Sequence, residues 1–172
     1  MTNFLKFQPT ITVCSSTKFW DDIILANAIL ATKNIMGFSP GFPMKQPENF
    51  PGAVEYLEKN QDVNRHLGVL HYQKIMRSDA IWVIDTNGYV GESTIKEIKF
   101  AHELGKPIFI TEQSELLQDL SYSHPLMNIK YEIVPLSFDS EFPIKFMNRY
   151  RVVNPNMAAV IYDDYVNGIS GT

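Results

Sequence analysis

The sequence predicts a single-domain α/β protein with an open, parallel, twisted sheet flanked by helices. Short apolar and β-branched runs alternate along the chain with segments whose apolar residues recur at helical spacing. The run "AIWVID", residues 80–85, is almost continuously apolar, which is typical of a central strand covered on both faces. A chain of 172 residues with 45% hydrophobic content is long enough to bury one core.

The first half of the chain predicts strand, loop, helix and a second strand in that order. "TITVC", residues 10–14, is a β-branched strand that ends in the polar turn "SST". Residues 19–34 predict a helix, and "IMGFSPGFP", residues 35–43, is a short strand running into Pro and Gly. We expect residues 45–62 to form an irregular crossing with one helical turn. The predicted helix carries its core side at Phe19, Ile23, Ala26, Ile29 and Leu30.

The second half repeats the alternation. Residues 63–79 predict a helix, and the strand at 80–85 follows it. "STIKEIKFAHEL", residues 93–104, is the next helix, with Gly105 as its C-terminal cap, and "PIFIT", residues 107–111, is another buried strand. Strands separated by helices in this way give parallel pairing with right-handed crossovers.

Residues 1–172 are expected to form one domain whose C-terminal extension, from about 113, is harder to assign. Within it "YEIVPL", residues 131–136, suggests a strand and "FPIKFMNRYR", residues 142–151, suggests a helix. The tail from Asn154 carries no assignable pattern.

Charge and composition favour a small soluble ligand over a polymer or a membrane. The formal net charge is −4 and no run of Lys and Arg is present, which argues against nucleic acid and anionic lipid. The start "MTNFLKFQPTITVCSS" lacks a secretion signal, so we expect a cytoplasmic protein. The single cysteine, Cys14, lies in an apolar run, where a buried small side chain is the expected role.

Two loops at the carboxyl ends of predicted strands carry the polar residues of a candidate site, because ligands of open α/β sheets bind there. The loop "SSTKF" and the helix start after it offer Ser15, Ser16, Thr17 and Phe19, and "DTNGYVGEST" offers Asp85, Asn87, Gly88, Tyr89, Gly91, Ser93 and Thr94. A helix N-terminus attracts phosphate or carboxylate, although Glu92 can occupy the same field. Alternatively, Ser93 is only a helix N-cap and the glycines only make the turn.

Glu97 is the candidate catalytic residue. On the predicted helix it shares a row with Thr94 and Ala101, and this row borders the apolar stripe. Burying an unpaired carboxylate is costly, so Glu97 either pairs with a lysine at the rim or faces the ligand. In the second case it is able to attack an electron-poor carbon.

The stretch "SDAIWVID…GYVGESTIKEIKFAHELGKPIFI" resembles the core of the nucleoside 2-deoxyribosyltransferase superfamily, including its nucleotide N-glycosidase members. "ITVCSSTKFWDDIILANAIL" is similar to the first strand, loop and helix of that family, so the likeness covers about the first two-thirds of the chain. The resemblance implies a Rossmann-like or flavodoxin-like fold without a cofactor, and a homo-oligomer whose sites are completed by a neighbouring chain.

The resemblance also implies roles for individual residues. Glu97 stands at the position of the family's nucleophile, and Asp85 at that of the acidic loop residue that binds the sugar or positions the nucleophile. Such enzymes cleave glycosidic bonds with retention through a glycosyl ester. His71 in "LHYQKI" replaces the family's upstream aspartate, which puts transfer to a free base in doubt. Ser93 corresponds to a serine with which nucleotide-cleaving relatives hold the 5′-phosphate.

A second resemblance leads to nearly the same chemistry. Phosphoribohydrolases formerly labelled lysine decarboxylases carry "PGGxGTxxE", and "GESTIKE" keeps the Thr-x-x-Glu spacing but inserts two residues after Gly91. The sequence therefore predicts an enzyme that cleaves or transfers at the N-glycosidic bond of a nucleoside or nucleoside 5′-monophosphate. In that site Ser15, Ser16 and Phe19 would line the base side, and His71 would contact the substrate.

Two further expectations remain. The alternative function is a non-catalytic nucleotide-binding or sensing module that uses the same residues. No metal site is expected, because His66 and His71 lie five apart without a carboxylate in register, and neither His102 nor His124 belongs to a ligand pattern.

Overall fold

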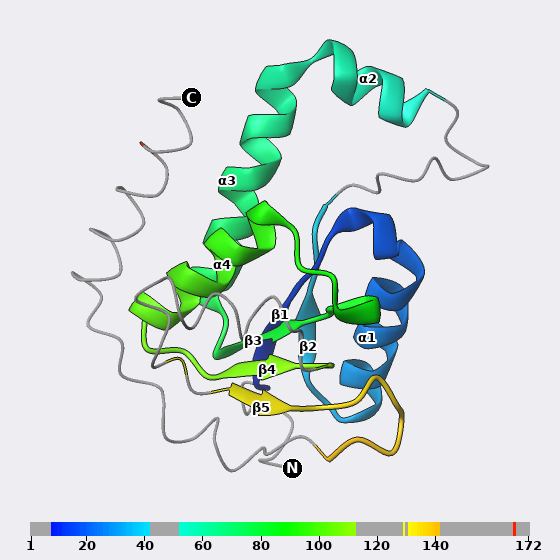
Figure 1. The fold of residues 1–172 in the computed structure, drawn as a ribbon, viewed down its shortest axis with the longest axis vertical. Coiled ribbons are helices and arrows are strands. Elements are labelled where there is room, and N and C mark those ends of the chain that lie inside the picture. The colour runs from blue at the N-terminus through cyan, green and yellow to red at the C-terminus, as the bar shows by residue number, and fades with distance from the viewer. Residues whose placement is uncertain (1–7, 42–51, 113–128, 130, 142–166, 168–172) are drawn as a thin grey trace, which may run out of the picture.

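The computed structural model describes residues 8–41, 52–112, 129, 131–141 and 167. Their helices and strands form an open α/β structure with a sheet at its centre (Figure 1). The elements, in chain order, are β1 (Thr10–Cys14), the 3-10 turn η1 (Thr17–Phe19), α1 (Trp20–Thr32), β2 (Met36–Phe38), α2 (Ala53–Lys59), α3 (Gln61–Arg77), β3 (Ala80–Val83), the 3-10 turn η2 (Thr86–Gly88), α4 (Glu92–Glu103), β4 (Ile108–Ile110) and β5 (Tyr131–Ile133).

The sheet has five strands in the order β2-β1-β3-β4-β5, and every pair is parallel. The predicted fold class is therefore confirmed. Strand β3 lies at the centre, and residues 80–85 are all almost completely buried, as the apolar run "AIWVID" predicts. At the start of β1, the carboxylate of Asp79 accepts hydrogen bonds from the backbone N–H and the hydroxyl of Thr10, at 2.8 and 3.0 Å. These bonds fix the register of β1 against β3.

Helices cover both faces of the sheet because successive strand residues point in opposite directions. On the α1 face, Ile11 and Val13 of β1 pack in one cluster with the buried side chains of α1. On the α3–α4 face, Cys14 of β1 packs in a second cluster with side chains of α3 and α4. Figure 1 shows α1 on one side of the sheet and α3 with α4 on the other. The buried side chains of α1 are Ile23, Ala26, Ile29 and Leu30, four of the five residues predicted.

One predicted segment is wrong and several are confirmed. Residues 53–59 form the helix α2, about two turns long, and α3 begins at Gln61, whereas an irregular crossing with one helical turn is expected over residues 45–62. Helix α2 follows Gly52, which takes φ +87, and this left-handed residue lets the chain turn into the helix. Helix α4 ends just before Gly105, with φ +68, as the capping pattern predicts.

The C-terminal predictions are only partly within the described residues. Strand β5 confirms the strand suggested by "YEIVPL". The helix suggested over 142–151 and the tail from Asn154, apart from Asn167, lie outside the described residues. Among the residues that the structure describes, no helix combines the length and the apolar character needed to cross a membrane.

Candidate active site

Glu97 lies on α4 beside the residues that pack on the sheet. Ile98 and Ala101 are buried, and Glu97 is the neighbouring position on the same side of the helix. Its side chain keeps 14% of its surface exposed. The prediction that Glu97 borders the packed face is therefore confirmed, and no lysine among the described residues forms an ion pair with it.

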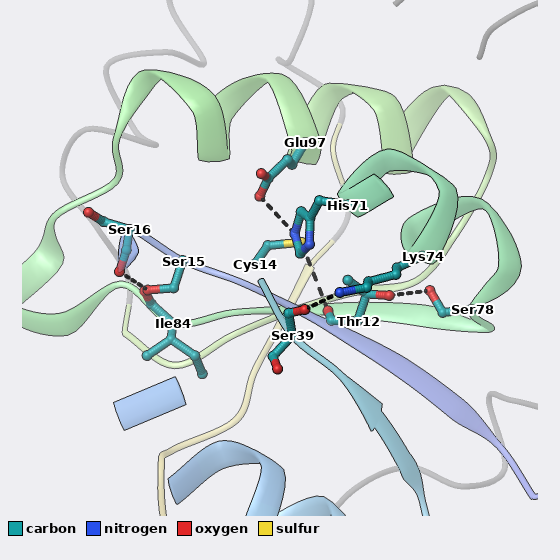
Figure 2. A network of polar contacts seen from close by, with 10 residues as sticks. All are labelled: Thr12, Cys14, Ser15, Ser16, Ser39, His71, Lys74, Ser78, Ile84 and Glu97. Atoms are coloured by element: carbon teal, nitrogen blue, oxygen red, sulfur yellow. Dashed lines mark hydrogen bonds and ion pairs between the residues drawn. The ribbon is translucent and has the colours of Figure 1, made fainter. Parts of the chain in front are cut away.

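The neighbour of Glu97 is His71 of α3. The Nε2 atom of His71 lies 3.5 Å from Oε2 of Glu97, and the imidazole is 7% exposed (Figure 2). His71 reaches this place because it shares the buried face of α3 with Ile75, four residues later. Two candidate residues from different helices, 26 positions apart in the chain, thus meet above the sheet.

Cys14 completes the group from a third element. Its Sγ, a ring nitrogen of His71 and a carboxylate oxygen of Glu97 all lie within 4.8 Å of one another. The expected burial of Cys14 is confirmed, at 0% exposure. Burial, and then the negative charge of Glu97, raise the pKa of the Cys14 thiol well above its ordinary value of 9.0. In this environment the side chain is a neutral thiol and a poor nucleophile.

The loop after β1 uses its serines to hold the strand ends together. The hydroxyl of Ser15 is buried and donates a 2.7 Å hydrogen bond to the backbone carbonyl of Ile84. The carbonyl of Ser16 accepts from the backbone N–H of Phe19 at 3.0 Å, which closes η1. Of the two predicted serines, Ser16 is the one with partial exposure.

Asp85 has a structural task at the end of the central strand. It is completely buried, and its Oδ1 accepts a 2.7 Å hydrogen bond from the backbone N–H of Glu112, just after β4. This bond ties the loop after β3 to the loop after β4. The catalytic assistance that the resemblance implies for Asp85 stays a prediction.

The loop between β3 and α4 turns sharply at Asn87 and Gly88. Asn87 takes φ 55 and Gly88 takes φ 72, both in the left-handed region that favours these residue types. The hydroxyl of Thr86 donates a 2.6 Å hydrogen bond to Asp22 of α1, so the turn is pinned to the α1 side. Asn87 itself is exposed.

The two aromatic candidates touch each other across the two loops. The rings of Phe19 and Tyr89 meet edge to face with centroids 5.9 Å apart. The Nζ atom of Lys18 lies 3.0 Å from the centre of the Tyr89 ring, a cation–π contact. Sequence reasoning missed Lys18, although its place in the loop after β1 marks it as a candidate.

Helix α4 begins before Ser93, so Ser93 is not its N-cap residue. Gly91 is the N-cap residue and α4 starts at Glu92, so the N-cap interpretation of Ser93 is wrong. Ser93 stands exposed in the first turn, whereas Thr94 is buried at 3% exposure. Glu92 extends along the helix to Lys96, with 3.3 Å between the carboxylate and the ammonium nitrogen.

Other polar contacts on the α3–α4 face hold α3 in place. The hydroxyl of Thr12 donates to the hydroxyl of Ser78 at 3.0 Å (Figure 2), and the hydroxyl of Ser78 donates to the backbone carbonyl of Ile75. The ammonium of Lys74 donates a 2.7 Å hydrogen bond to the carbonyl of Ser39, just after β2, and partial burial lowers the pKa of Lys74. Helix α3, and with it His71, is therefore anchored to two strands.

Comparison with known proteins adds no family. The chain matches none of the protein-family models, and no curated protein matches it. The resemblance to the nucleoside 2-deoxyribosyltransferases therefore stays a prediction from the sequence.

Proposed function

We propose that the protein cleaves the N-glycosidic bond of a nucleoside or nucleoside 5′-monophosphate with Glu97 as the nucleophile. The observation that carries the proposal is the environment of Glu97. Its carboxylate is largely buried beside Cys14, the last residue of β1, with His71 as its close neighbour. Stability alone would place a carboxylate in water, and ligands of this fold class bind near the carboxyl ends of strands, so this position supports a functional role.

The reaction would proceed in two displacement steps. A carboxylate oxygen of Glu97 forms a bond to the anomeric carbon while the carbon–nitrogen bond to the base breaks, and the leaving base takes one proton from solvent. Water then attacks the same carbon and breaks its bond to Glu97, which releases the sugar with a new hydroxyl, restores the carboxylate and returns one proton to solvent. His71, with Nε2 3.5 Å from Oε2 of Glu97, would orient the carboxylate during both steps.

The N-terminal turn of α4 supports a monophosphate as the substrate. The free N–H groups there, the exposed hydroxyl of Ser93 and the ammonium of Lys18 on the neighbouring loop are donors suited to a phosphate. The carboxylate of Glu92 pairs with Lys96, one turn further along the helix, so its side chain points away from the helix N-terminus that would bind the phosphate. The base would lie toward Phe19 and Tyr89, whose rings offer apolar surface for stacking.

The test is an incubation of the full chain with nucleosides and their 5′-monophosphates, ribo and deoxy, with and without a free base. Chromatography measures released or exchanged base. We expect release from at least one substrate, and its loss in Glu97→Ala. Glu103→Ala, an exposed acid on the same helix, is the matched control and should keep the activity.

The pattern of products distinguishes the remaining possibilities. Exchange with the added base identifies a transferase, and release without exchange a hydrolase. Unchanged turnover in Glu97→Ala rules out the nucleophile assignment. No turnover, together with a ligand-dependent rise in melting temperature, favours a nucleotide-binding module instead. Light scattering in the same buffer tests the homo-oligomer that the family resemblance implies.

A further inference from the structure

The group formed by Cys14, His71 and Glu97, here called the Cys-His-Glu cluster, offers one sulfur, one nitrogen and one oxygen ligand. These atoms lie within 4.8 Å of one another and come from β1, α3 and α4 (Figure 2). The expectation that no metal site is present rests on ligand spacing within single segments. Ligand spacing within one segment does not detect a site whose three ligands come from three different elements.

The second observation is the unsatisfied imidazole of His71. Its side chain is 7% exposed, and neither ring nitrogen has a hydrogen-bond partner among the described residues. The buried Oε2 of Glu97 likewise has no hydrogen bond there. The 3.5 Å between Nε2 and Oε2 is longer than a normal hydrogen bond between these atoms. Because buried polar atoms are nearly always paired, a partner between these two is indicated.

We propose that the Cys-His-Glu cluster binds a divalent transition-metal cation of the zinc type. Tetrahedral Zn²⁺ takes thiolate, imidazole and carboxylate ligands at about 2.0 to 2.3 Å, so its ligand atoms lie roughly 3.3 to 3.6 Å apart. The 3.5 Å separation of Nε2 and Oε2 matches this spacing, and the three ligand atoms, which lie within 4.8 Å of one another, would draw closer around the cation. Mg²⁺ and Ca²⁺ are excluded as the preferred ions because they select oxygen ligands.

Binding would displace the thiol proton of Cys14 to solvent and join the sulfur to the cation. With three protein ligands, the fourth position is left to water or a ligand. The site itself rests on geometry and ligand chemistry, but its consequence rests on the proposed function. A cation that holds the Glu97 carboxylate removes the proposed nucleophile, so zinc would inhibit N-glycosidic cleavage.

The direct test is a Co²⁺ titration of the chelator-treated full chain, followed by absorption spectroscopy. Cobalt replaces zinc in such sites and has visible d–d bands, and a thiolate ligand adds a near-ultraviolet charge-transfer band. Since Cys14 is the only cysteine, that band reports on one residue without ambiguity. We expect a saturable charge-transfer band that is abolished by added Zn²⁺.

Variants assign the ligands. Cys14→Ser should lose the charge-transfer band, and His71→Ala should weaken cobalt binding by about a hundredfold or more, since even loss of an outer-shell partner costs about 10- to 100-fold. His66→Ala, an exposed histidine on the same helix, is the control and should bind as the parent does. Zinc should raise the melting temperature of the parent and of His66→Ala but not of Cys14→Ser.

Two results would overturn the site: no saturable cobalt band in the folded parent protein, or a charge-transfer band that persists in Cys14→Ser. If Cys14→Ser fails to fold, as judged by circular dichroism, His71→Ala and the zinc-dependent melting of the parent decide the question. None of these measurements uses catalysis. A cobalt band in a protein that shows no turnover in its metal-free, chelator-treated form would therefore refute the proposed function and leave the metal site standing.

Discussion

The two faces of the sheet are built from the same strands but are filled differently. The α1 face is closed by a wholly apolar helix surface, whose buried side chains are Ile23, Ala26, Ile29 and Leu30. On the α3–α4 face, the buried side chains of the helices include His71 and Thr94, with Ser78 just beyond α3. Glu97 lies among them, partly exposed.

This difference indicates that the α1 face serves mainly stability and the α3–α4 face mainly the proposed activity. Buried polar groups lower stability unless they are satisfied, so a face that needs only to be stable is best filled with aliphatic side chains. The α1 face follows that rule. On the α3–α4 face, His71 lies beside Glu97, which is where the proposed chemistry requires a polar side chain. Stability should therefore respond most to changes on the α1 face, and activity to changes on the α3–α4 face.

The largest effect is expected for Glu97→Gln. Under the proposed function, the substitution removes the nucleophile and should lower the rate of base release by at least about a thousandfold, as nucleophile removal does elsewhere. The amide is similar in size and carries no charge, so the free energy of unfolding should be equal to or higher than that of the parent. Paired activity assays and urea unfolding measure both quantities. A destabilised but active variant would reverse the division between the faces.

The counterpart on the α1 face is Leu30→Ala. Leu30 is completely buried in the apolar cluster beneath α1, and truncation leaves a cavity. Comparable substitutions cost about 2 to 5 kcal/mol of unfolding free energy. Urea unfolding should show this loss, whereas the turnover of the folded fraction should change less than about threefold, within the scatter of remote substitutions. An equal loss in turnover would show that the α1 face contributes to the site directly.

The fold was predictable from the sequence because its signals are local. The apolar run at 80–85 and the periodicity of 19–34 each depend on residues close in the chain. The length of α2 was underestimated because Pro47, Pro51 and Gly52, which precede the helix in the sequence, suggest a loop.

The candidate site was predictable only in part. The position of Glu97 on α4 follows from helical spacing alone. Its contact with His71 depends on how α3 packs against α4, and the approach of Cys14 depends on the register of β1. No spacing rule joins residues from three elements. Residue type can also mislead. Ser15 was predicted to bind the ligand, but its hydroxyl donates a hydrogen bond to the backbone carbonyl of Ile84.

A moderate effect is expected for Thr12→Val, a change on the α3–α4 face away from Glu97. The substitution keeps the shape of the buried side chain and removes its hydrogen bond to Ser78, while Ser78 keeps its bond to the carbonyl of Ile75. The loss should be about 1 kcal/mol of unfolding free energy. Thermal or urea unfolding measures it. A loss as large as that of Leu30→Ala would mean that the polar contacts of this face contribute as much stability as the apolar packing of the other.

An effect confined to alkaline pH is expected for Cys14→Ala. The pKa of the Cys14 thiol is raised in the folded protein by burial and by Glu97, so above about pH 9 the unfolded thiol ionises while the folded one keeps its proton. The folded state then binds more protons than the unfolded state, and the parent loses stability as the pH rises through this window, by at most about 1.4 kcal/mol per pH unit. Cys14→Ala lacks this loss. The difference in unfolding free energy between parent and variant should therefore shrink between about pH 8 and pH 10, with the lysines and tyrosines cancelling because both proteins contain them. A constant difference would mean that the thiol ionises equally in both states, and that the α3–α4 face around Glu97 is open to water.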